Sequence, residues 1–121
     1  MVLLDEVHLK ELAQQIGAAP AYQGTVPCWW QLALELGFNE TAVASINIEQ
    51  QRRLGTGIAG GGAEFAIQEA CALQMLKVWR DQLKASIERK CALLHKGLQT
   101  LGLAEIERDL CHREYLWLSL L

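Results

Sequence analysis

Apolar residues recur along this chain at intervals of three and four, which is the spacing of one face of an α-helix. The first stripe of this kind consists of Leu9, Leu12, Ala13 and Ile16. Because glycine commonly follows the last turn of a helix, the stripe predicts a first helix that stops at Gly17.

Two more helical stripes follow residues 18–26, which contain a proline and a glycine and are predicted as a loop. The second helix is predicted to open around Pro27, because the fixed φ of proline suits the first turn, and to end at Gly37. Asn39 is a suitable N-cap for a short third helix. The apolar positions of these helices are Trp29, Leu32, Ala33 and Leu36, and then Val43 and Ile46.

The helical pattern breaks between residues 54 and 63, where five of the ten glycines lie, so a flexible Gly-rich loop is predicted at 55–62. A longer fourth helix is expected from about Glu64 to Leu83, a fifth after a Ser86 cap, and a sixth after Gly102. Their apolar positions are Ala72, Met75, Leu76, Trp79 and Leu83, then Ile87, Cys91, Leu94 and Leu98, and then Leu103, Ile106 and Leu110.

No segment of any length alternates with the two-residue period of a half-buried strand. Residues 1–121 are therefore predicted to form one all-α domain of six helices. Trp29 and Trp79 lie on apolar stripes and are expected to be buried near one another. An apolar tail at 111–121 is expected to extend the sixth helix and fold back on the bundle, with docking to a partner as the alternative.

Length and composition limit the class of protein further. A net charge of −3 provides no basic field for nucleic acid, and the apolar runs are far shorter than the ~20 residues that span a bilayer. Charged residues interrupt positions 1–16, which excludes a signal peptide there and favours the cytoplasm. Four scattered cysteines, Cys28, Cys71, Cys91 and Cys111, are expected to be small buried hydrophobes, although a two-disulfide secreted fold is a second interpretation.

The sequence motifs for cofactor binding, metal binding and catalysis are weak. Residues 55–60 read G-x-G-x-x-G, but no buried strand precedes them as a dinucleotide site requires, so no cofactor is expected. Cys91 with His95, and Cys111 with His112, are two half-sites about 20 residues apart, which does not match the usual spacing of a zinc site. No catalytic residue and no metal site is therefore predicted, and the chain is not expected to be an enzyme.

Charged residues are unevenly distributed. Residues 11–51 contain no Lys or Arg, whereas residues 77–96 contain six against two acidic residues. Trp30, adjacent to Trp29 on a helix, should point about 100° away and be half exposed, where a Trp can anchor an interface. The predicted protein-interaction residues are Trp30, Glu35, Glu40 and Glu49, together with Lys77, Arg80 and Lys84 on one flank of the fourth helix.

Three segments resemble the death-domain family. Residues 29–38 (WWQLALELGF) resemble its second-helix signature, residues 72–79 (ALQMLKVW) its fourth-helix motif with a core Trp, and residues 93–106 its fifth-to-sixth helix junction. The resemblance covers roughly residues 4–110. It departs from the family in the long glycine-rich loop, in Trp30 where a basic residue is common, and in the apolar Leu101-Gly102-Leu103 before the sixth helix.

The resemblance implies a six-helix antiparallel Greek-key bundle. It further implies a non-catalytic interaction module that assembles with itself or with other death-domain proteins in apoptotic or innate-immune signalling. Such a domain would be cytoplasmic, either as an adaptor or as the intracellular part of a larger receptor. The alternative is a helical scaffold or subunit domain that binds an unrelated protein.

Overall fold

The computed structural model describes the backbone of residues 4–19, 24, 26–54 and 62–119, with the side chains at 54, 62–65 and 117–119 excepted. Within this part of the chain the only regular elements are helices, so the all-α prediction is confirmed. They are α1 (Glu6–Ala18), α2 (Cys28–Glu35), α3 (Glu40–Leu54), α4 (Gly62–Gln82), α5 (Ile87–Thr100) and α6 (Ala104–Ser119).

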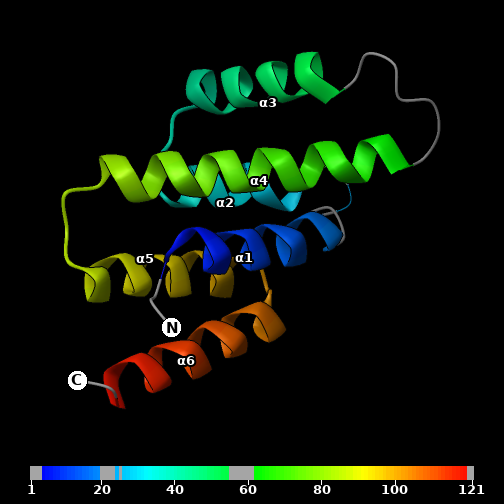
Figure 1. The fold of residues 1–121 in the computed structure, drawn as a ribbon. Helices are drawn as coiled ribbons and strands as arrows, with labels where there is room; N and C mark the ends of the chain where they lie inside the picture. Colours follow the sequence, from blue (N-terminus) through cyan, green and yellow to red (C-terminus); the bar gives the residue numbers. More distant parts are fainter. Residues whose placement is uncertain (1–3, 20–23, 25, 55–61, 120–121) are drawn as a thin grey trace.

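The longest helix, α4, lies in the middle of the molecule (Figure 1). It packs on α1 most extensively and also on α3 and α2. α3 forms one edge of the molecule, beside α4, whereas α6 forms the opposite edge and packs on α5 and α1. The two edges therefore present separate surfaces to solvent.

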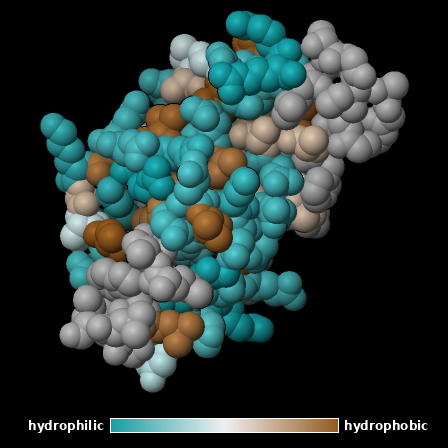
Figure 2. Space-filling view, in the orientation of Figure 1, coloured by the Kyte–Doolittle hydropathy of each residue, from teal (hydrophilic) through white to brown (hydrophobic). Residues whose placement is uncertain are grey.

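The core contains the apolar stripes that the sequence predicts. Trp29 is 1% exposed and Trp79 is 4% exposed, which confirms that both are buried. The ring of Trp29 lies 5.6 Å from the ring of Trp30, centroid to centroid, at the favourable tilt of an aromatic pair. Figure 2 shows the result at the surface, where hydrophilic side chains cover most of the visible face and apolar ones are scattered between them.

Helix ends follow the expected capping chemistry at several positions. The Asn39 side chain accepts a hydrogen bond from the Ala42 amide at 2.8 Å, and Ser86 accepts one from the Arg89 amide at 3.2 Å. Gly37 and Gly102 follow α2 and α5 with φ angles of 104° and 73°, so each closes a C-terminal motif that a side-chain-bearing residue would strain.

Four local predictions need correction. Gly17 does not stop the first helix but lies inside α1, where a Cβ would meet the Glu69 backbone at 3.0 Å, so this glycine permits close packing of α1 on α4. The third helix is not short, because it continues to Leu54. Gly62 begins α4 and is not part of the loop, while residues 55–61 fall outside the described residues. Lys84 follows the end of α4 and does not share its flank.

The C-terminal tail follows the prediction only in its backbone. α6 continues to Ser119, as expected. Tyr115 is 70% exposed and Leu116 is 37% exposed, so these two side chains do not fold back on the bundle. The side chains at 117–121 fall outside the described residues.

Candidate functional site

The predicted acidic residues lie on α2 and α3, with Glu35 at the end of α2 near Gly97 of α5. Glu35 is the last residue of α2, Glu40 is the first of α3, and Glu49 lies near the end of α3; all three are exposed. Glu35 accepts a hydrogen bond from Gln31 Nε2 at 3.3 Å, and Glu49 pairs with Arg53 Nη2 at 3.5 Å. Because exposed ion pairs of this kind contribute little to stability, these carboxylates remain available to a partner.

The outer side of α3 carries an apolar side chain that the sequence prediction missed. Ile48 is 58% exposed, and Thr41 and Ser45, seven and three residues earlier on the same side, are also exposed. We call Thr41, Ser45 and Ile48 the α3 outer face. The sequence could have predicted this exposed position, because Ile48 is two residues from the inward-facing Ile46 and so points about 200° away from it on the helix.

Trp30 is half-buried and packs against the core, which confirms the expected partial exposure. Its ring also packs against Trp29. Trp30 is therefore less accessible to a partner than Ile48.

Two of the cations predicted on the flank of the fourth helix, Lys77 and Arg80, contact residues at and just before the start of α1. Lys77 Nζ lies 2.9 Å from Glu6 Oε1, and this cation lowers the pKa of the Glu6 carboxyl. Arg80 Nη1 donates to the Leu4 carbonyl at 3.0 Å, and its side chain is only 27% exposed. Of the three predicted cations, only Lys84 is exposed on the surface.

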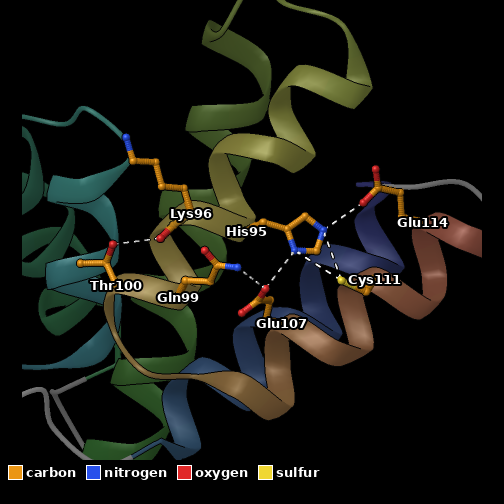
Figure 3. A network of polar contacts seen from close by, with 7 residues as sticks. All are labelled: His95, Lys96, Gln99, Thr100, Glu107, Cys111 and Glu114. Carbon is orange, nitrogen blue, oxygen red and sulfur yellow. Dashed lines mark hydrogen bonds and ion pairs between the residues drawn. The ribbon is translucent and has the colours of Figure 1, made fainter.

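A second group of polar side chains joins α5 to α6 (Figure 3). Glu107, Cys111 and Glu114 are four and three residues apart, so they share one face of α6. His95 projects toward them from α5: its Nε2 lies 2.9 Å from Glu114 Oε2, and its Nδ1 lies 3.9 Å from Glu107 Oε1 and 3.7 Å from Cys111 Sγ. We call His95, Glu107, Cys111 and Glu114 the α5–α6 cluster.

The helix phases explain why this cluster sits at the rim of the interface. The inward positions of α5 and α6 are occupied by buried side chains, namely Leu94, Leu98, Ile106 and Leu110. A neighbouring residue on either helix points about 100° aside and lies at the margin of the core. The side chain of His95 is 17% exposed and that of Glu107 is 21% exposed, whereas Cys111 is exposed. The cluster is thus packed by protein on one side and open to solvent on the other.

The contact with Glu114 assigns one proton of the His95 ring. An ionised carboxylate only accepts, so the 2.9 Å contact with Glu114 places a proton on His95 Nε2. In the neutral ring the lone pair is then on Nδ1, which lies 3.9 Å from Glu107 Oε1. Cys111 Sγ lies at nearly equal distances from the two ring nitrogens, 3.7 Å from Nδ1 and 3.8 Å from Nε2. Gln99 Nε2 donates to Glu107 Oε1 at 2.7 Å and holds that carboxylate in place.

The cysteines differ in environment. Cys28, Cys71 and Cys91 are buried as expected, and burial raises the pKa of Cys71 and of Cys91 to about 12. Cys111 is exposed, which corrects the prediction for that residue; partial burial, followed by the charges of Glu107 and Glu114, raises its pKa. A raised pKa does not favour a nucleophilic thiolate at any of these positions.

The sequence contains two possible metal half-sites, Cys91 with His95 and Cys111 with His112. The α5–α6 cluster contains one residue of each. His95 faces Cys111, whereas Cys91 lies in the core and His112 is exposed elsewhere on α6. Pairing across two helices depends on how α5 and α6 pack, so spacing along the chain did not reveal it.

No family model matches this chain, and no curated protein or solved structure matches it. Among the described residues, no helix combines the length and the apolar character that crossing a bilayer requires.

Proposed function

We propose that this domain is a non-catalytic protein–protein interaction module of the death-domain type. It would have the six-helix Greek-key topology and assemble with itself or with related domains in apoptotic or innate-immune signalling. Support comes from the motif residues. Trp29 and Trp79, which carry the resemblance, are core residues, and the Leu36-Gly37 pair ends α2 in the turn that the motif requires.

The observation that carries the proposal is the exposed surface of α2 and α3. Glu35, Glu40 and Glu49 are exposed there, and the α3 outer face presents Ile48. Individual exposed ion pairs contribute only ~0–1 kcal/mol, whereas burial of the part of Ile48 that is still exposed, 58% of the residue, contributes about 1–2 kcal/mol. A partner with a cationic surface and an apolar recess would therefore gain affinity from Ile48 and orientation from the carboxylates.

A second copy of the domain offers cations in a different place. Lys84 lies in the connection between α4 and α5, and Arg89 lies in the first turn of α5; both are exposed. The carboxylates lie on α2 and α3. Contact between unlike patches is heterologous, so it propagates into a ring or an open helix instead of stopping at a dimer.

The test compares sedimentation of the purified domain at 50 and 500 mM salt, where the Debye lengths are about 14 and 4 Å. We expect weak self-association, or binding to a related death domain, that salt diminishes. Lys84→Glu should weaken it, and mixing that variant with Glu40→Lys should restore it. Arg80 is unsuitable for charge reversal because its guanidinium holds Leu4.

The matched control is Arg108→Glu, which makes the same charge change at an exposed position on α6, at the edge opposite α3. It should leave association unchanged, whereas Ile48→Asp should abolish it. Monomeric behaviour at both salt concentrations, with no binding to related domains, would refute the homotypic proposal. Binding of an unrelated protein through Ile48 would then support the scaffold alternative.

A further inference from the structure

We propose that His95, Glu107 and Cys111 form a binding site for one zinc ion between α5 and α6. The proposal is independent of the assembly proposal, because it uses none of the residues assigned to the assembly surface. It rests on convergence of three ligand types from two helices and on the hydrogen bonds that orient them.

The separation of the nitrogen and sulfur atoms is close to the one that zinc imposes, and the carboxylate oxygen lies nearby. One nitrogen, one sulfur and one carboxylate oxygen, all within 4.8 Å of one another, can serve as donors. Zn–N bonds of about 2.0–2.1 Å and Zn–S bonds of about 2.3 Å put these two atoms about 3.6 Å apart in a tetrahedron. Nδ1 and Sγ lie 3.7 Å apart, and Nδ1 and Glu107 Oε1 lie 3.9 Å apart. Rotation of the Glu107 side chain toward Nδ1 would have to complete the site.

Outer hydrogen bonds already orient two of the ligands. A zinc-bound histidine usually donates its other ring N–H to a carboxylate, and Glu114 accepts from His95 Nε2 in this way. Nδ1 is therefore the ring nitrogen that can bind a metal. Because Cys111 Sγ lies 3.7 Å from Nδ1 and 3.8 Å from Nε2, the ring must turn to aim the Nδ1 lone pair between Sγ and Glu107 Oε1. Gln99 holds Glu107 by a 2.7 Å hydrogen bond.

The mixture of donors selects the metal. Calcium and magnesium take oxygen ligands, so a site that includes a thiolate and an imidazole does not suit them. Zinc accepts nitrogen, sulfur and oxygen together in tetrahedral geometry. Three protein ligands leave the fourth position to water, and the exposure of Cys111 places that position toward solvent.

An ion at this position would fasten α6 to α5. His95 lies on α5, while Glu107 and Cys111 lie one turn apart on α6. Because a ligand that binds only the folded state stabilises it, zinc should raise the melting temperature in proportion to the logarithm of its concentration above Kd.

Cobalt(II) serves as the spectroscopic probe, because thiolate coordination gives a charge-transfer absorption in the near ultraviolet. Titration of the reduced protein should saturate at one ion per chain, and zinc should displace cobalt. We expect Cys111→Ser to remove the band and His95→Gln to abolish saturable binding. Glu114→Gln should weaken zinc binding about 10- to 100-fold, as measured by competition with a chromophoric chelator.

His112→Gln is the matched control, since His112 is an exposed histidine next to Cys111 that lies outside the cluster. It should bind zinc as the unmodified protein does. Circular dichroism without metal checks that every variant is folded, and substitution of the exposed Cys111 should leave it so. Absence of the band at excess cobalt, a band that survives Cys111→Ser, or affinity that is insensitive to His95→Gln would each overturn the proposal.

Discussion

Gly17→Ala tests how closely α1 and α4 pack. Alanine is favoured over glycine inside a helix by about 1 kcal/mol, so propensity alone predicts stabilisation. An ideal Cβ at Gly17, however, lies 3.0 Å from both Cα and N of Glu69, which is tighter than ordinary van der Waals contact. The obstacle is backbone, so it cannot be relieved by rotation of a side chain.

To admit the methyl group, α1 and α4 must separate by a few tenths of an ångström. This interface includes fully buried Leu9, Leu12, Met75 and Leu76, whose contacts weaken with even a small gap. Overpacking of a well-packed core costs about 1–3 kcal/mol, so the expected net effect of Gly17→Ala is a loss of about 1 kcal/mol after the propensity gain.

Urea unfolding followed by tryptophan fluorescence measures the effect, and the melting temperature should fall by roughly 3–6 °C. Ala18→Gly, at the exposed neighbouring position, measures the local propensity contribution in the opposite direction. When the change in the free energy of unfolding for Gly17→Ala is corrected for this propensity contribution, the remainder is the packing cost at Gly17. A rise in stability of about 1 kcal/mol for Gly17→Ala would refute the close approach of the two helices.

Three further predictions concern the pH dependence, the core and the tie between α1 and α4. Burial lowers the pKa of His8, so the unfolded chain binds a proton that the folded chain does not. Stability should fall as pH decreases below about 6.5, by at most about 1.4 kcal/mol per unit, and His8→Gln should flatten this slope in melting curves between pH 7.5 and 5. Trp29→Ala should cost about 3–5 kcal/mol in urea unfolding, and a cost below about 1 kcal/mol would be inconsistent with its burial. Arg80→Ala should cost about 1–2 kcal/mol through loss of its bond to the Leu4 carbonyl, against less than about 0.5 kcal/mol for Lys84→Ala; equal costs would contradict that bond.

Local chemistry along the sequence was sufficient to predict the helices and several of their ends. The apolar stripes through Trp29 and Trp79 predicted burial correctly, because a 3.6-residue period fixes which side of a helix faces the core. Asn39 and Ser86 were recognised as caps because their side chains bond to amides only three residues away. Such interactions depend on no other part of the fold.

Contacts between distant segments could be decided only by the tertiary structure. Gly17 looked like a stop signal, but its missing side chain leaves room for the Glu69 backbone where α1 packs on α4, which no local rule reveals. Arg80 looked like a surface cation, yet its partner is a carbonyl 76 residues earlier. His95 and Cys111 belonged to separate pairs in the sequence and meet only because α5 and α6 pack with those faces together. Side-chain spacing fixes which residues share a helix face, whereas the packing of whole helices fixes which faces meet.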